Sequence, residues 1–179
     1  SRALGVEHQE QWYTRGIMPI AHFAALSRHY GIEDYGGVTI GATGSRDELP
    51  AILTLTPELI RLLGFFTAEG NYNVSPEAGQ YNLAITGIAR APAVQAAATL
   101  TGGSPDTATI YEVEAERSRA IEVTPGGELN HLLFRYVFGI PEGAAGKRLP
   151  GIVYHVSDLL LHEFLSALFT GDGSVDYRP

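Results

Sequence analysis

The 179-residue chain contains no cysteine, and this absence excludes disulfide bonds and thiolate metal sites. It suits a reducing compartment, so we expect a cytoplasmic location. The sequence also lacks any uninterrupted apolar run of about 18 residues, which a membrane-spanning helix would need. No signal-peptide pattern opens the sequence. We therefore expect no membrane partner, and the length favours one folded domain with its own core.

Positive charge is the second scarcity. Twelve basic residues face twenty acidic ones, the net charge is -8, and Lys147 is the only lysine. Proteins that bind nucleic acid are usually basic, because phosphate contacts need lysine or arginine. An acidic composition poor in lysine is typical of proteins from salt-loving organisms. The composition therefore counts against nucleic-acid binding unless the arginines gather on one face.

Two nine-residue segments of the chain are near-copies of each other. The first is LLGFFTAEG (62–70) and the second is LSALFTGDG (165–173). Thr56-Pro57 and Ser157-Asp158 supply the capping residues that begin helices, so each copy predicts a helix that ends at its acid. We expect the closing glycines, Gly70 and Gly173, to take the left-handed conformation common after a helix.

Small residues recur at helical spacing within both copies: Gly64 and Ala68 in the first, Ala167 and Gly171 in the second. Two helices with small residues on facing sides can pack very closely. Such packing would bring the terminal acids, Glu69 and Asp172, to one place. A carboxylate at a helix C-terminus is electrostatically unfavourable, so a pair of them predicts a bound cation. Paired carboxylates bind hard divalent cations such as Mg²⁺, which can activate water for phosphodiester cleavage.

These segments resemble the two motif copies of the LAGLIDADG family, and the extended form LTPELIRLLGFFTAEG resembles the endonuclease domain of archaeal inteins. The acidic, lysine-poor composition would fit an intein from a haloarchaeon. The element GKRLPGIVYHV (146–156) agrees, because the family places a lysine, a basic residue and a proline before its second motif helix. The resemblance implies a metal-dependent, site-specific endonuclease that cuts double-stranded DNA. It implies that Glu69, Asp172 and Lys147 are catalytic, that both acids hold Mg²⁺, and that the parent chain contains a splicing domain.

The remaining pattern predicts an α+β fold in the order of the family's αββαββα unit. Expected elements are a helix within 16–31, a hairpin over 71–86, a helix over 91–100, a hairpin over 108–123 and a helix over 128–138. Residues 1–54 would link to the splicing domain, and 55–140 would form the first half. Residues 141–179 would hold a linker and the second motif helix, with the pseudo-symmetric second half truncated after it.

An antiparallel sheet with helices on one face leaves its other face open, and the family uses that face as a saddle over the DNA major groove. Asparagine suits adenine, and arginine suits guanine or phosphate. The candidate DNA-binding residues, each of which could equally be a solvated surface residue, are Asn71, Asn73, Asn82, Thr86, Arg117 and Arg119.

Two other functions stay open. The same fold could be retained as a catalytically inactive LAGLIDADG-type module that binds DNA or RNA, which the acidic composition favours and the two intact acids disfavour. A nucleotide-binding enzyme could be built on the glycine turn Gly41–Gly44, although no phosphate-binding loop motif is present there.

Overall fold

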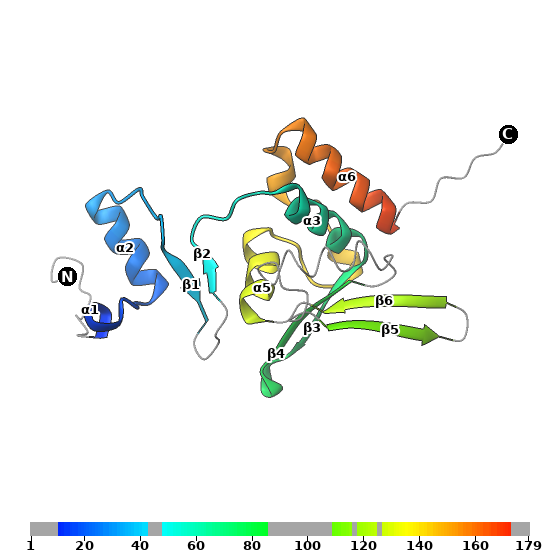
Figure 1. The fold of residues 1–179 in the computed structure, drawn as a ribbon, viewed down its shortest axis with the longest axis horizontal. Helices are drawn as coiled ribbons and strands as arrows, with labels where there is room; N and C mark the ends of the chain where they lie inside the picture. Colours follow the sequence, from blue (N-terminus) through cyan, green and yellow to red (C-terminus); the bar gives the residue numbers. More distant parts are fainter. Residues whose placement is uncertain (1–10, 43–47, 86–108, 116–117, 125–126, 173–179) are drawn as a thin grey trace. The chain divides into compact units, whose positions relative to one another are not determined.

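The computed structural model describes residues 11–42, 48–85, 109–115, 118–124 and 127–172 (Figure 1). The chain divides into two compact units, 1–41 with 48–53, and 42–47 with 54–179. The predicted helix over 91–100, together with Thr86 and Arg117, lies outside the described residues.

The first unit contains two helices, α1 (Gln11–Arg15) and α2 (Ile20–Tyr30). As predicted, α2 ends at a glycine: Gly31 takes the left-handed conformation with φ 63°. A two-stranded antiparallel sheet follows, formed by β1 (Thr39–Gly41) and β2 (Glu48–Pro50). The predicted glycine turn at 41–44 falls mostly outside the described residues, so nucleotide binding there stays untested.

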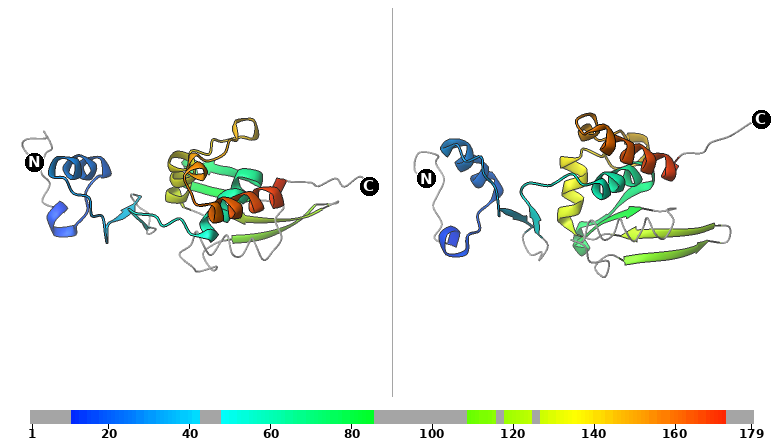
Figure 2. Two further views of the ribbon diagram at one scale, coloured as in Figure 1. Left: turned by 90° about the horizontal axis from the view of Figure 1, so that it is seen from above. Right: turned by 45° about the horizontal axis from the view of Figure 1, so that its top comes forward.

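The second unit combines a four-stranded antiparallel sheet with helices, which confirms the α+β class. Its elements are α3 (Pro57–Glu69), β3 (Gly70–Ser75), η2 (Pro76–Ala78), β4 (Gln80–Ile85), β5 (Thr109–Ala115), β6 (Ser118–Thr124), α5 (Glu128–Leu132), η4 (Leu133–Val137), η5 (Ala144–Gly146), η6 (Gly151–Tyr154) and α6 (Asp158–Asp172). The strand order is β3-β4-β6-β5. Figures 1 and 2 show α3 over one side of this sheet and α6 beside α3.

The sequence around α3 explains both its start and its burial. Thr56 caps the helix, with its Oγ1 accepting from the Leu59 amide at 3.3 Å, and Pro57 occupies the first turn. Ile60, Leu63 and Phe66 are at most 1% exposed. An apolar surface of this size would keep α3 on the sheet, because burying each such side chain contributes about 1.5–3 kcal/mol.

Gly70 corrects one prediction. Its φ is -74° and its ψ is 148°, so it is the extended first residue of β3 and not a left-handed cap. A Cβ at this position would lie 2.3 Å from Cδ2 of Phe66 and 2.4 Å from the Phe66 carbonyl oxygen. The glycine is therefore required by the close approach of the strand to the helix it follows. Gly173 lies outside the described residues.

The strand register decides which residues share a face. Tyr72 pairs with Leu83, and both are buried on the helix-covered face. Asn73 pairs with Asn82, and Asn71 pairs with Ala84, so the three asparagines belong to the opposite face as predicted. Position 119 is different. Ile85 pairs with Val123, and the alternation from Val123 puts position 119 on the face of Ile85, away from the asparagines.

Aromatic side chains join the helices to the sheet. The Phe66 ring lies 5.1 Å from Tyr72 and 4.9 Å from Phe134, edge to face in both pairs. The predicted helix over 128–138 is present, but it changes at Leu133 from α5 into the π-helical turn η4. The Tyr72 hydroxyl donates to the Ile140 carbonyl at 2.7 Å, and burial raises the pKa of this hydroxyl. These contacts fix the loop after η4 against β3.

Acidification is expected to destabilise the second unit through His131. This side chain is buried between the rings of Tyr72 and Tyr81, and its Nδ1 has no hydrogen-bond partner among the described residues. Burial lowers the pKa of His131, with nearby Arg135 acting in the same direction, whereas the unfolded chain titrates near 6.5. At a pH between the folded and the unfolded pKa of His131, the side chain is protonated in the unfolded chain and neutral in the folded protein. Stability is thus complete above about pH 6.5 and falls as the pH drops toward the folded pKa.

The measurement is denaturant unfolding of the wild type and His131→Phe at a series of pH values from about 7.5 to about 5.5, a range that spans the usual titration of histidine. We expect the wild type to lose more stability than the variant, whose ring can keep the contact with Tyr72. Equal losses in both proteins would show that His131 does not carry the effect.

None of the helices in the described part of the chain combines the length and the apolar character needed to cross a membrane.

Candidate active site at the paired helix ends

The two motif helices run side by side in the same direction. Arg61 of α3 meets Glu163 of α6, and Gly64 lies against Phe164, Ala167 and Leu168. A Cβ on Gly64 would be 2.5 Å from the Phe164 carbonyl oxygen and 2.8 Å from the Ala167 Cβ. The backbones approach this closely only because the residue is glycine.

A second close contact lies one turn further along. A Cβ on Gly171 would be 2.7 Å from the Ala68 Cβ and 3.6 Å from the Glu69 Cγ. The four small residues of the repeated motif therefore face one another in two pairs, Gly64 with Ala167 and Ala68 with Gly171. The second pair brings the Glu69 side chain next to the residue that precedes Asp172.

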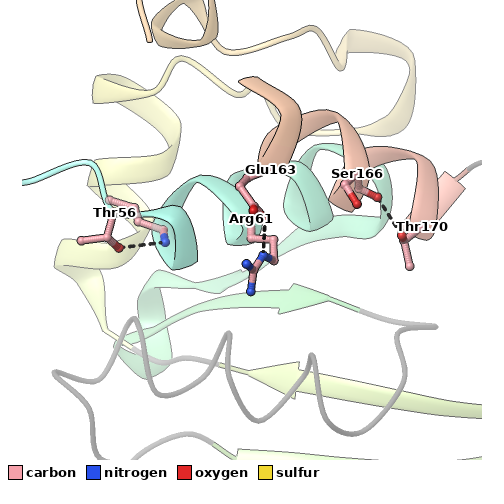
Figure 3. A network of polar contacts seen from close by, with 6 residues as sticks. Thr56, Arg61, Glu163, Ser166 and Thr170 are labelled. Atoms are coloured by element: carbon pink, nitrogen blue, oxygen red, sulfur yellow. Dashed lines mark hydrogen bonds and ion pairs between the residues drawn. The ribbon is translucent and has the colours of Figure 1, made fainter. Parts of the chain in front are cut away.

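An ion pair fixes the other end of this interface (Figure 3). Nε of Arg61 donates to Oε2 of Glu163 at 2.8 Å, and the two side chains are 34% and 23% exposed. Figure 3 also shows Thr170 beside Ser166, whose carbonyl accepts from the Thr170 hydroxyl at 2.7 Å. Thr67 makes the matching bond to Leu63 in α3. The motif repeat thus extends to hydrogen bonds within the last turns.

Replacing Glu163 with glutamine should lower the free energy of unfolding by about 0.5–1 kcal/mol, because a partly exposed ion pair is screened by solvent. Denaturant unfolding at low and high salt checks this value. The difference between the two proteins should shrink at high salt. A difference that salt leaves unchanged would show that the loss does not come from the charge on Glu163.

Lys147 reaches this end of the interface from the segment before α6. Its Nζ donates to the carbonyl oxygen of Ala68 at 2.6 Å across 79 residues of sequence, and the contact is partly buried. Carbonyl groups at a helix C-terminus lack partners within the helix and carry the negative end of its dipole. The ammonium therefore brings a positive charge to the C-terminal end of α3, the helix that ends at Glu69.

The predicted acids end their helices. Glu69 is the last residue of α3 and is half-buried, and Asp172 is the last residue of α6. The Asp172 side chain lies outside the described part of the structure. Neither helix has a basic residue in its last turn, so each ends in carbonyl oxygens and an acidic residue, and Lys147 donates to one of these carbonyls, that of Ala68 in α3. This set of oxygens has the chemistry that Mg²⁺ prefers.

Within the described residues, no group of three or more histidine, cysteine, aspartate or glutamate side chains could hold a metal ion. The candidate site has two acids and so would depend on carbonyl oxygens, water or substrate phosphate for its other ligands, which is usual for Mg²⁺.

Of the predicted DNA-binding residues, the three asparagines lie on one face of the β3–β4 hairpin. Asn71 and Asn73 are exposed on β3, and Asn82 is partly buried on β4. Asn73 and Asn82 are direct cross-strand partners, so these amides form a block on the face opposite the helices. Position 119 belongs to the other face, and Thr86 and Arg117 are not described.

Sequence reasoning missed Arg61 and Glu163, which are 102 residues apart and show no local motif. A signal was available: they lie close to equivalent positions of the two copies, one basic and one acidic. The link from Tyr72 to Ile140 had no comparable signal.

No family model matches the chain. The large subunit of DNA polymerase II from Thermococcus kodakarensis (strain ATCC BAA-918 / JCM 12380 / KOD1) is 25% identical to it over 175 residues. This alignment covers 97% of the chain and 9% of that subunit. The chain thus corresponds to a small part of the length of the protein that it matches.

Proposed function

We propose that the chain is the homing endonuclease domain of an intein, with a LAGLIDADG-type fold, and that it cuts double-stranded DNA by metal-dependent hydrolysis. The observation that carries this proposal is the parallel contact of α3 and α6 through Gly64 and Gly171. Each helix ends at an acid, and Lys147 donates to the Ala68 carbonyl at the end of α3.

Glu69 and Asp172 would hold Mg²⁺ at the adjoining helix ends. A bound divalent cation supplies a water of lowered pKa and offsets charge on the phosphate oxygens. Lys147 would stabilise negative charge on the same phosphate, since its ammonium already reaches the end of α3 at the Ala68 carbonyl. The charge balance supports these roles, because two carboxylates and two helix dipoles exceed the single positive charge of the lysine.

The open face of the β3–β4 hairpin would enter the major groove, which admits a two-stranded ribbon. The exposed or partly exposed positions on this face of the two strands are Asn71, Asn73, Ser75, Gln80 and Asn82, and none of them is charged. Amide side chains pair best with adenine, so we propose that this hairpin reads A·T base pairs. Affinity from phosphate contacts would have to come from other parts of the chain.

The match to the polymerase subunit supports an inserted domain. Nearly the whole of this chain aligns with a segment that makes up 9% of a long polymerase chain. A separately folding insert in a host protein would give these proportions. We propose that a splicing domain accompanies this segment in the parent chain and that the host is a protein of DNA replication, located in the cytoplasm.

The second candidate is a LAGLIDADG-type module that binds DNA or RNA without cutting. The net charge of -8 favours it only weakly, since acidic composition disfavours both binding and cleavage. The two acids at the helix ends are unfavourable in a module that holds no cation.

Cleavage of a plasmid library separates the two candidates. The library would carry polymerase-subunit genes from which the matching segment has been removed, so that the insertion junction is restored. We expect cutting at this junction with magnesium and none with chelator. Plasmids with the restored junction should be cut faster than plasmids whose gene retains the segment. Salt-sensitive DNA binding with no cutting would favour the binding module. Neither binding nor cutting by a folded chain would overturn both.

A further inference from the structure

The contact between Lys147 and Ala68 has a second consequence. The Lys147 ammonium donates a partly buried hydrogen bond of 2.6 Å to the carbonyl oxygen of Ala68, the residue that precedes Glu69. The last turns of α3 and α6 contain no basic residue of their own. The positive charge at the end of α3 therefore comes from Lys147, in the segment before α6.

The same oxygens are the ones that a divalent cation would bind. Hard cations take backbone carbonyl and carboxylate oxygens together, and here the Ala68 carbonyl is adjacent in sequence to the Glu69 carboxylate. An ammonium on that carbonyl and a divalent cation at Glu69 would repel each other over a few ångströms. The Lys147 ammonium and a divalent cation would therefore each weaken the binding of the other at this helix end.

We propose that Lys147 and a divalent cation compete for the C-terminal end of α3. This inference rests on the proposed function, because it takes Glu69 as a metal ligand. In the metal-free protein Lys147 is a positioning residue that holds α3 against the segment leading to α6. Binding of the cation releases the ammonium from Ala68 and makes it available to a substrate phosphate.

Lys147 can be followed without a mutation, because it is the only lysine in the chain. An amine-acylating reagent therefore modifies one side chain and the chain's α-amine, which serves as an internal reference in mass spectrometry. The hydrogen bond to Ala68 should protect Lys147 in chelator. We expect MgCl₂ or CaCl₂ to raise its acylation rate several-fold relative to the α-amine, and NaCl of equal ionic strength to leave the rate unchanged.

Thermal unfolding gives a second readout. In chelator, Lys147→Met should lower Tm by about 2–4 °C, the size expected for losing a charge at a helix end. Magnesium should raise the Tm of this variant more than that of the wild type, because the cation replaces the missing charge. Arg148→Met is the matched control, since Arg148 is the exposed neighbour of Lys147 and makes only a 3.5 Å contact with Gly139. It should respond to magnesium as the wild type does.

The outcomes separate the two proposals. One outcome would overturn the competition and keep the metal site. In it, magnesium raises Tm equally in the wild type and Lys147→Met, Glu69→Gln abolishes both gains, and the acylation rate of Lys147 does not change. No response of Tm or of acylation to magnesium or calcium in the wild type would overturn the metal site and the competition together. If Lys147→Met does not fold, the acylation rate of the wild type decides alone.

Discussion

Replacing Gly64 with valine is expected to lower the free energy of unfolding by about 2–3 kcal/mol and Tm by roughly 5–10 °C. The Cβ alone would stand 2.5 Å from the Phe164 carbonyl oxygen and 2.8 Å from the Ala167 Cβ. The nearer atom belongs to the backbone of α6, so no side-chain rotation can relieve the contact. The two helices must move apart, and the apolar contact between them is lost.

Gly151→Val is the matched control, because a Cβ on Gly151 meets nothing within 4 Å among the described residues, and its φ is not positive. Denaturant and thermal unfolding of both variants measure the difference. Because helix propensity differs little between glycine and valine, packing decides the result at position 64. A Gly64→Val protein as stable as the control would mean that α3 and α6 do not pack as described.

Glu69→Gln and Asp172→Asn are each expected to reduce magnesium-dependent DNA cleavage by at least about 10³-fold. Each substitution keeps the size of the side chain and removes one anionic ligand, and the charge stabilisation from a catalytic metal is worth several kcal/mol. DNA binding in chelator should change little, because neither acid contacts DNA favourably without a cation. The double variant should be hardly worse than either single one, since both remove the same metal.

Single-turnover cleavage of the junction plasmid, with binding measured in parallel, checks this prediction. Glu33→Gln is the control, because it removes one exposed carboxylate from the other unit of the chain. Cleavage that survives either substitution at the level of this control would assign the reaction to other residues.

Local signals in the sequence were sufficient for much of the fold. Thr56-Pro57 predicts the start of α3, and Pro76 and Gly79 predict the turn between β3 and β4. The alternation of polar and apolar residues along β4 placed Asn82 on the face opposite Leu83, as the structure shows. In each case the determining residues lie within a few positions of the feature that they determine.

The errors arose where distant segments decide the outcome. Gly70 is predicted to cap α3, but β3 starts there, because Gly70 pairs with Ile85 of β4. The sequence made no prediction of the face of position 119, because that face depends on the pairing between Ile85 and Val123, which cannot be derived from β6 alone. The close packing of the two motif helices was more predictable, because the motif repeat itself encodes the small residues that face each other. The family resemblance pointed to Lys147, but only the fold shows that it reaches Ala68.

The central claim is that α3 and α6 end side by side and place Glu69 and Asp172 in one site. The absence of native cysteine allows a direct measurement: cross-linking of Glu69→Cys/Asp172→Cys by mild oxidation or a short thiol-reactive linker. Arg61→Cys/Glu163→Cys is the positive control, and Glu69→Cys/Asp158→Cys is the negative control, because Asp158 begins α6. The account predicts rapid intramolecular cross-linking of the first two pairs and none of the third. Cross-linking of the positive control without cross-linking of the acid pair would contradict a shared site.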